Sequence, residues 1–517
     1  MNRRFVLSNK NIILLCFIIA KFVLQYLLIN PVYDLQRDEY LHLDQANHLA
    51  WGYISVPPFT SWISYIIRIL GNGYFWVKFF PALFGALTIV VVWKTIEALK
   101  GNLFALVLGS LAILLSVVLR INILYQPNSF DIFFWMLVYF TVIKYIDTNN
   151  SRWLLAAGAA FGFGFLSKYN IVFLALGLVP AILLSRQRKI FNEKNLYIGA
   201  AIALVIMLPN IVWQFKNDFP TLTQLQELSR TQLVNVNRSD FVKEQFIFFA
   251  GSLIIILGAF ISLLFYSPFR KYRFFLWTYF ITLFIFIFFK AKAYYAIGLY
   301  PVLLAFGSVY LEKILENQRR KFWKPVLIMA IVLGSVPLIL IAFPFQSPAK
   351  IQEVSQRYRK LGLLRWEDGK EHNMPQDFAD MLGWSELARK TDAAYAPINN
   401  KDNTLVICDN YGQAGAINYY SGYKNINAVS LNADYINWIS LDKKIVNMIL
   451  VREANDSDEI VEALKGFFTQ CTIAGKIENE YAREMGTTIY LFTGAKTDIN
   501  KIISQKINER KAAAKTP

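Results

Sequence analysis

Long blocks of apolar residues, separated by short polar stretches, fill the first two thirds of the chain. A helix needs about 17 to 25 such residues to cross a bilayer, and the sequence predicts about eleven crossings. We place them at residues 11–30, 76–98, 102–119, 130–147, 153–167, 170–185, 195–212, 246–266, 274–290, 294–312 and 325–344. This pattern predicts a polytopic α-helical membrane protein.

The pattern changes after the last of these blocks. Short apolar runs at 404–408 and 445–451 alternate with stretches of helical periodicity such as 457–468, which is typical of a small soluble α/β domain. We therefore expect three parts: a membrane domain over residues 1–345, a soluble α/β domain over 346–500 and a basic, Ala-rich flexible tail over 501–517.

Composition agrees with a membrane protein and accounts for the charge. The chain is 55% hydrophobic and 16% aromatic, and its formal net charge is +17. Its Lys and Arg residues gather in short loops between apolar blocks, where the positive-inside rule explains them, so no nucleic-acid binding is expected. A cytoplasmic N-terminus, beginning with the basic start Met1–Arg4, puts these loops inside. It puts the loop 31–75 and the soluble domain outside, which in a Gram-negative cell means the inner membrane and the periplasm.

The predicted outer loop 31–75 contains Arg37-Asp38-Glu39-Tyr40 and, further on, Pro57-Pro58. Apolar residues at helical spacing up to Gly52 predict an amphipathic helix that lies on the membrane surface. Such a helix would bring Asp38 to the mouth of the membrane bundle, where a lipid head group would sit. A plain N-cap is the alternative for Asp38.

Metal binding is a further alternative for this loop. Glu39 and His42 share one helix face, as metal ligands often do, so a divalent metal is kept as an alternative, although no cofactor is otherwise expected. The cysteines Cys16, Cys408 and Cys471 have no metal-ligand spacing. The last two form a disulfide only if the fold brings them together.

Other polar residues stand at the predicted outer ends of the spans. Asp131 begins the fourth span, where an unpaired buried charge would be costly, and an N-cap is its alternative role. Lys168 and Lys292 also lie at ends of apolar blocks, where a lysine binds an anionic group or extends to the membrane interface without binding anything. Four further residues are weaker candidates for ligand contacts, with plain packing as their alternative: His42, Trp213, Gln214 and Tyr411.

The Asp-Glu pair after the first span, the helix that follows it and the Pro57-Pro58 turn resemble glycosyltransferase family 39. That family includes protein O-mannosyltransferases and the aminoarabinose transferases of lipid A. The resemblance implies a GT-C fold, a polyprenyl-phosphate sugar donor and an extracytoplasmic acceptor. It also implies an inverting displacement with Asp38 as the general base, and with Glu39 and Asp131 beside it in the catalytic cavity.

The resemblance further implies that Lys292, and more loosely Tyr295, approach the phosphate of the carrier. This chain departs from the aminoarabinose transferases at one point, because they have a Lys directly before the Pro of the first-loop turn and this chain has Val56. Lys168 is expected to substitute for that Lys.

A secondary transporter or a flippase-like envelope protein is the rival hypothesis, because both classes combine many spans with buried charges. We see no repeated half and no matched pair of interrupted helices in the sequence, and transporters rarely carry a soluble outer domain of this size. The sequence therefore favours a glycosyltransferase. It does not specify the sugar or the acceptor, because pocket shape decides these.

Overall fold

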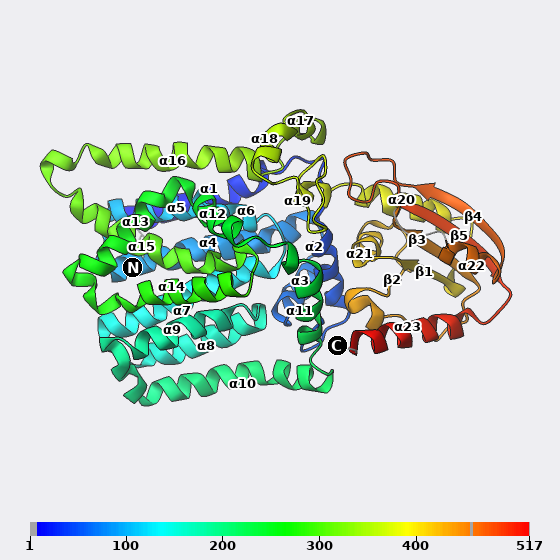
Figure 1. Ribbon diagram of the computed structural model, residues 1–517, viewed down its shortest axis with the longest axis horizontal. Helices are drawn as coiled ribbons and strands as arrows, with labels where there is room; N and C mark the ends of the chain where they lie inside the picture. The colour runs from blue at the N-terminus through cyan, green and yellow to red at the C-terminus, as the bar shows by residue number, and fades with distance from the viewer. Residues whose placement is uncertain (1–7, 455–458, 516–517) are drawn as a thin grey trace, which may run out of the picture.

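A bundle of long helices is joined to a domain built on a β-sheet in the computed structural model, which describes residues 8–454 and 459–515 (Figure 1). Each predicted span overlaps one of the bundle helices: α1 (Asn9–Leu27), α4 (Tyr74–Ala98), α5 (Leu103–Leu114), α7 (Pro127–Thr148), α8 (Arg152–Ser167), α9 (Ile171–Leu183), α10 (Lys194–Lys216), α13 (Leu253–Phe265), α14 (Phe274–Phe288), α15 (Tyr300–Ile314) and α16 (Trp323–Ala342). The expectation of a polytopic helical membrane protein is confirmed.

The number of crossings depends on how the shorter helices are treated. In the part of the chain that the structure describes, six helices are long and apolar enough to cross a membrane, and up to eight if each of two bent pairs is one span. The bent pairs are α9 with η2 (Arg186–Asn192) and α12 (Arg238–Phe248) with α13. Three shorter apolar helices, α5, α8 and α14, would have to cross as well to give about eleven, so that count stays a prediction.

Shorter helices connect the bundle helices to each other and to the sheet domain. Among them, α2, α3 and α11 lie at the end of the bundle that faces the sheet domain (Figure 1). The connecting helices are α2 (Arg37–Asp44), η1 (Gln45–Asn47), α3 (Phe59–Ile69), α6 (Val117–Ile121), α11 (Pro220–Thr231), η6 (Ala293–Leu299), α17 (Pro348–Glu353), α18 (Ser355–Lys360) and α19 (Gln376–Ala379).

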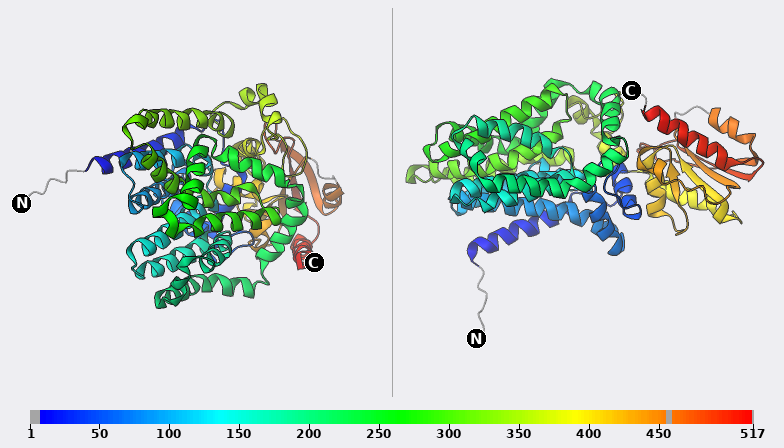
Figure 2. Two further views of the ribbon diagram at one scale, coloured as in Figure 1. Left: turned by 60° about the vertical axis from the view of Figure 1, so that its left-hand side comes forward. Right: turned by 90° about the horizontal axis from the view of Figure 1, so that it is seen from below.

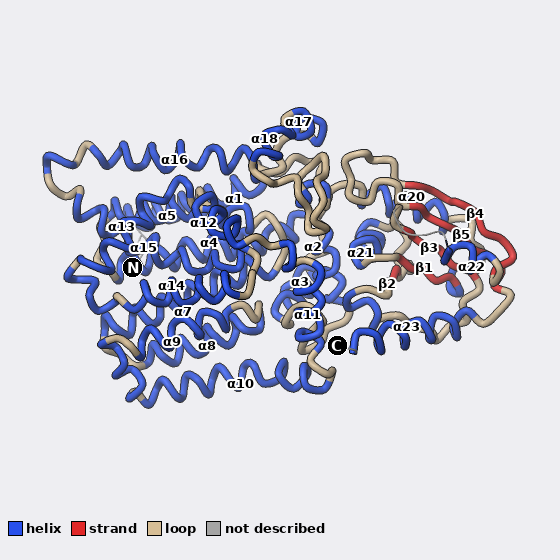
Figure 3. The backbone as a smooth tube through the Cα atoms, in the orientation of Figure 1, coloured by secondary structure: helices blue, strands red, loops and turns tan. Residues whose placement is uncertain are grey.

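The sheet domain has five strands in the order β2-β1-β3-β5-β4, and they are confined to the end of the molecule away from the bundle (Figure 3). β1 runs parallel to β2 and β3, whereas β5 is antiparallel to β3 and β4. The predicted apolar runs at 404–408 and 445–451 are the central strands of this sheet. The strands are β1 (Thr404–Cys408), β2 (Ala428–Ser430), β3 (Asn447–Arg452), β4 (Phe468–Lys476) and β5 (Thr488–Ala495).

Helices cover both faces of this sheet. Along β1, Val406 and Cys408 pack toward α20 (Trp384–Tyr395) and α21 (Tyr411–Tyr420), while Leu405 and Ile407 pack toward α22 (Glu459–Lys465) and α23 (Ile499–Lys515). Alternate residues of a strand point to opposite faces, so one short apolar run serves two cores. The view from below shows α23 and the yellow helices on opposite sides of the sheet (Figure 2). The face covered by α21 is the one turned toward α2 and the bundle.

Three expectations need correction. The first-loop helix ends at Asp44 instead of continuing to Gly52, and it is buried between the bundle and α21, so it does not lie free on a membrane surface. The expected flexible tail forms α23 as far as Lys515, because Ile499 and Ile503 are buried against the sheet. The stretch expected to be a helix over 457–468 forms α22 and the start of β4, while residues 457–458, the basic start 1–4 and the last two residues lie outside the described part.

The two cysteines of the sheet domain are free thiols. Cys408 lies on β1 and Cys471 on β4, with β3 and β5 between these strands. Strands lie about 4.8 Å apart, so three strand spacings separate the two chains by about 14 Å. This exceeds the Cα separation of about 7 Å beyond which a disulfide cannot form, so the two do not pair in this fold.

Candidate functional site

Asp38 is the second residue of α2, at the junction of the bundle and the sheet domain. The N-cap of this helix is Gln36, whose side chain accepts a hydrogen bond from the Asp38 amide, so Asp38 is not the cap. Its carboxylate accepts hydrogen bonds from the Tyr411 hydroxyl at 2.6 Å and from Gln126 Nε2 at 3.1 Å. The side chain remains 37% exposed. Asp38 is thus fixed in direction and still accessible to a ligand.

A chain of hydrogen bonds joins Asp38 to Lys168. Gln126 Oε1 accepts from Asn128 Nδ2 at 3.0 Å, and Asn128 Oδ1 accepts from Lys168 Nζ at 2.6 Å. We call these four side chains the carboxylate–lysine chain: Asp38, Gln126, Asn128 and Lys168. Helix α2, the start of α7 and the end of α8 contribute to it. A candidate base and a candidate phosphate ligand therefore stand at its two ends.

Aromatic rings surround the ammonium group of Lys168. It lies 4.2 Å from the ring centre of Tyr295 and 5.1 Å from that of Tyr294, within the range of cation–π attraction. Burial lowers the pKa of Lys168, and the neighbouring charge of Lys292 lowers it further, whereas Tyr295 and Asp131 oppose the shift. The site thus holds two cations close enough to repel each other, which favours an anion between them.

Lys292 is held by an acidic residue from the segment between α18 and α19. Its Nζ lies 2.5 Å from Glu367 Oε1, and Gln376 Nε2 donates to Glu367 Oε2 at 3.2 Å. Burial opposes the charged form of Lys292, but Glu367 outweighs it and raises the pKa of the lysine, with a further contribution from Asp38. Lys292 therefore lies in the electrostatic field of Asp38 and stays charged.

Asp131 lies deeper in the bundle, on the fifth residue of α7, and only 4% of it is exposed. It accepts hydrogen bonds from Trp135 Nε1 at 2.9 Å and from Asn170 Nδ2 at 2.8 Å. Asn170 also donates to the carbonyl of Tyr295 at 3.0 Å. Because α7 begins at Pro127, Asp131 is not its N-cap; it links α7, the start of α9 and η6 beneath Lys168.

Glu39 points away from Asp38 into the protein. It is fully buried, and its carboxylate accepts from Lys78 Nζ at 2.7 and 2.8 Å and from the Tyr125 amide at 2.6 Å. It also accepts from the Gln36 amide at 2.6 Å, which completes a capping box. Every contact of Glu39 is therefore internal, and these contacts fix α2 to α4 and to the turn before α7.

The other candidates lie around this centre. Nothing within the described ranges groups three or more His, Cys, Asp or Glu as metal ligands, and His42 is buried on α2 with its carbonyl accepting from Ser64 Oγ. Gln214 Nε2 donates to the hydroxyls of Tyr169 and Thr221. Trp213 packs on Gly52, where an added Cβ would lie 2.4 Å from its ring. Gln214 and Trp213 thus hold the segments around Tyr169, Thr221 and Gly52 against α10. Neither residue contacts Asp38.

The segment around Tyr411 docks α21 on α2. An added Cβ would lie 2.4 Å from Arg37 Cγ at Gly412 and 2.7 Å from Tyr40 Cβ at Gly415, so only glycine allows this approach. Tyr411 meets Asp38 at one end of the contact. At the other end, Asn418 Nδ2 donates to Asp44 Oδ2 at 2.7 Å. The glycines of this segment thus bring a tyrosine of the sheet domain onto the candidate base.

Sequence reasoning missed some residues of this site. Gln126 and Asn128 lie between the spans predicted at 102–119 and 130–147, but nothing local indicates that their amides connect Asp38 to Lys168. Glu367 lies 75 residues from Lys292 in a polar stretch without periodicity. No signal in a single sequence would have paired these two.

Comparisons with known proteins show what this chain is similar to. Residues 55–213 match the family model described as dolichyl-phosphate-mannose-protein mannosyltransferase. The lipid A galacturonosyltransferase RgtD of Rhizobium johnstonii is 24% identical over 203 residues, which are 38% of this chain and 43% of RgtD. The lipopolysaccharide core galacturonosyltransferase RgtB of the same organism is 29% identical over 225 residues, 41% of this chain and 44% of RgtB. The matches thus span less than half the length of these relatives.

The fold has a relative over nearly its whole length. The structure of ArnT from Cupriavidus metallidurans bound to undecaprenyl phosphate superposes with a TM-score of 0.61 at 14% identity, covering 94% of this chain and 98% of ArnT. At this identity the likeness concerns the fold alone. It confirms, together with the family match, the resemblance that the sequence suggested.

Proposed function

We propose that this chain, which has the GT-C fold and matches the dolichyl-phosphate-mannose-protein mannosyltransferase model over residues 55–213, is a membrane glycosyltransferase. Its donor would be a sugar on a polyprenyl phosphate, because ArnT was solved with undecaprenyl phosphate. Its acceptor would be lipid A or a lipopolysaccharide core, the substrates named for RgtD and RgtB. The observation that carries the proposal is the carboxylate–lysine chain.

The reaction would be a single displacement at the anomeric carbon. An acceptor hydroxyl attacks this carbon and gives its proton to Asp38, while the bond from the carbon to the phosphate oxygen breaks and its electrons leave with the polyprenyl phosphate. A positioned carboxylate is suited to this role because the hydroxyl becomes nucleophilic only as it loses its proton. The donors Tyr411 and Gln126 keep the carboxylate pointing at the site. The expected outcome is inversion at the anomeric carbon.

Lys168 and Lys292 would bind the phosphate of the donor. Negative charge on this phosphate grows as the bond breaks, and cations fixed beforehand stabilise it without reorganising. The rings of Tyr294 and Tyr295 hold Lys168, and Glu367 holds Lys292. Asp131 would act as a positioning residue through Asn170 and the Tyr295 carbonyl. Glu39 would position α2 and not touch the substrate.

The orientation in the membrane follows from the charge distribution. Arg186, Arg270, Lys271 and Arg273 line a basic pocket formed by η2, η5 (Ser267–Tyr272) and the start of α14, at the end of the bundle away from the sheet domain (Figure 1). By the positive-inside rule this end faces the cytoplasm. We therefore infer an inner-membrane protein with about eleven crossings, a cytoplasmic N-terminus and a periplasmic sheet domain.

The test combines purified protein in lipid nanodiscs with a panel of polyprenyl-phosphate sugars, including undecaprenyl-phosphate galacturonic acid, and with lipid A and core acceptors. Asp38→Asn should lower turnover by about 10²- to 10⁴-fold, with undecaprenyl phosphate still bound. Lys168→Met and Lys292→Met should weaken donor binding. The control is Asp442→Asn, because Asp442 is exposed on the sheet domain.

Two results would overturn the proposal. In the first, Asp38→Asn transfers sugar as fast as the wild type. In the second, the wild type transfers no sugar from any donor but moves a sugar or lipid across sealed vesicles, which would favour the transporter or flippase hypothesis.

A further inference from the structure

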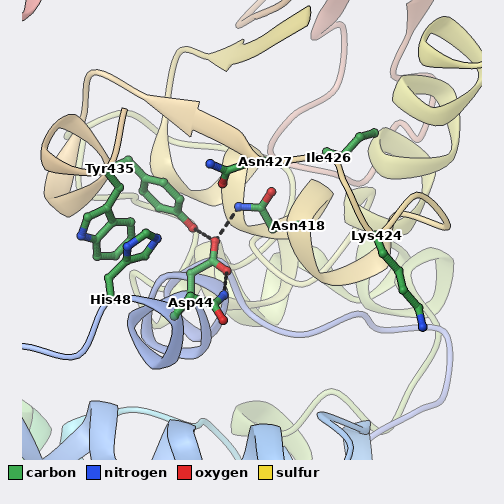
Figure 4. Close-up of a pocket in the computed structure, with 9 residues that line it drawn as sticks. Asp44, His48, Asn418, Lys424, Ile426, Asn427 and Tyr435 are labelled. Carbon is green, nitrogen blue, oxygen red and sulfur yellow. Dashed lines mark hydrogen bonds between the residues drawn. The ribbon is translucent and has the colours of Figure 1, made fainter. Parts of the chain in front are cut away.

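A second polar pocket lies at the far end of α2 from Asp38, between the first loop and the sheet domain (Figure 4). Its volume is about 370 Å³. Side chains from α2, from α21 and the turn after it, and from η9 (Ala433–Asn437) and its C-cap line it, chiefly Asp44, Asn418, Lys424, Asn427, Tyr435 and Trp438. The proposed reaction assigns no role to the residues that line this pocket.

The floor of the pocket is a fixed carboxylate. Asp44 accepts hydrogen bonds from Asn418 Nδ2 at 2.7 Å, the Tyr435 hydroxyl at 2.5 Å and Asn47 Nδ2 at 3.3 Å, and Figure 4 shows them converging on it. Asn418 is itself fixed to the backbone of Ala428 by bonds of 2.7 and 3.0 Å. Burial raises the pKa of Asp44 to about 6, although these three donors oppose the shift. The polar groups are therefore in place before any ligand arrives.

The opposite side of the pocket carries groups that are free to bind. Among the residues described, Lys424 and Asn427 have no hydrogen-bond or ion-pair partner, and both are exposed. Trp438 supplies an aromatic wall, stacked on His48 with ring centres 4.3 Å apart. The pocket thus combines a carboxylate, amides, an ammonium group and aromatic rings.

This combination fits a sugar. Carboxylate and amide groups together accept from and donate to hydroxyls, and aromatic walls pack against the apolar C–H edges of a sugar ring. Pockets of about 300–1,000 Å³ with a few convergent polar groups are typical of small-ligand sites. The ammonium group of Lys424 favours an acidic or phosphorylated sugar.

We propose that this pocket is a saccharide-binding subsite that holds a sugar unit of the acceptor while another part of it reacts at Asp38. This proposal rests on the proposed function. Asp38 and Asp44 are six residues apart on α2, which places them about 9 Å apart along the helix axis. Both contact α21, through Tyr411 and Asn418. A saccharide bound at Asp44 would therefore contact α2, which carries Asp38, and α21, which donates a hydrogen bond to Asp38 through Tyr411.

Direct binding tests the proposal without any transfer reaction. The probes are galactose, galacturonic acid and the soluble oligosaccharide released from a lipopolysaccharide core, with binding followed by saturation-transfer NMR on the full protein in nanodiscs. Asn427→Ala and Trp438→Ala should raise Kd at least tenfold. The matched control Asn437→Ala changes an exposed neighbour outside the pocket and should bind as the wild type does.

Transfer kinetics give a second readout. The pocket variants should raise KM for the acceptor about tenfold and leave KM for the donor unchanged. Lys424→Met changes an exposed side chain, so it keeps the test valid if Trp438→Ala does not fold. Its effect should be largest with galacturonic acid and should shrink at high salt, because an exposed ion pair is screened.

The proposal is overturned if the wild type binds none of the three probes, or if wild type and pocket variants bind them equally. These outcomes are distinct from a failure of the proposed function. If the wild type binds none of the probes, or binds them no better than the pocket variants, while transfer still depends on Asp38, the subsite alone is defeated. If transfer survives Asp38→Asn, the proposed enzyme mechanism is defeated. The binding data then test only whether the pocket binds a saccharide.

Discussion

The buried ion pair between Glu39 and Lys78 offers a stringent test of how α2 is positioned. Both side chains are 0% exposed and the Nζ–Oε1 distance is 2.7 Å. Because Glu39 also accepts from the amides of Gln36 and Tyr125, it joins α2, α4 and the turn before α7. Glu39→Gln removes the charge with almost no change in volume, and Lys78→Met removes the opposite charge.

The expected cost follows from burial. Removing one member of a buried pair leaves the other charge without compensation and costs about 3–5 kcal/mol. The double variant should lose less than the sum of the single losses, since no unpaired charge remains, with a coupling energy of about 2–3 kcal/mol. An exposed pair, Lys350–Glu353, has the same N–O distance of 2.7 Å, but its side chains are 56% and 62% exposed. Glu353→Gln should therefore cost less than about 1 kcal/mol.

The measurement is unfolding in mixed micelles for wild type, both single variants, the double variant and Glu353→Gln. Turnover is measured in parallel. Because Glu39 fixes the helix that carries Asp38, Glu39→Gln should also slow transfer, and a displacement of about 1 Å is enough for a 10²-fold loss. Single losses below about 1 kcal/mol, or single losses that simply add in the double variant, would refute the reasoning.

Three further predictions concern the contact between α2 and the sheet domain. Tyr411→Phe removes the 2.6 Å hydrogen bond to Asp38 and should lower turnover about tenfold, the equivalent of one hydrogen bond, with the unfolding temperature nearly unchanged. Gly415→Ala forces a Cβ to within 2.7 Å of Tyr40 and should cost about 1–3 kcal/mol, seen as faster proteolysis between bundle and domain. Gly422→Ala should not, because a Cβ there would meet only Asp392 Oδ2, at an ordinary contact distance of 3.6 Å. Burial raises the pKa of Asp44 and of Asp434 to about 6, so the folded state binds more protons than the unfolded state from about pH 4 to 6. Stability from these two groups should be lost as pH rises through this window, and Asp434→Asn should flatten the unfolding temperature against pH.

The bundle could be predicted from sequence because hydropathy is local. Each span is a continuous apolar block, and helix α4 needs no distant residue to be recognised. The same holds for the strands β1 and β3, whose short apolar runs are bounded by polar turns. The tail was misjudged because its basic composition was given more weight than Ile499, Ile503 and Ile507, which recur at helical spacing and pack against the sheet.

The site was only half predictable. Asp38, Lys168 and Lys292 stood out because charges at the ends of apolar blocks need a reason. Tyr411 was a candidate too, but its pairing with Asp38 was not predictable, since its hydroxyl lies 373 residues from Asp38 in the chain. Glu367 did not stand out at all, and it lies 75 residues from Lys292. Such pairings depend on how the sheet domain docks, and no local pattern encodes that.

The origin of these partners indicates what the sheet domain does. One oxygen of the Asp38 carboxylate is held from the bundle by Gln126 and the other from the sheet domain by Tyr411. The charge of Lys292 is balanced by Glu367, which lies beyond the last bundle helix. A bundle without this part of the chain would therefore lose one of the two donors to its carboxylate and the counter-charge of one lysine. The chain beyond the bundle therefore supplies direct partners to both Asp38 and Lys292.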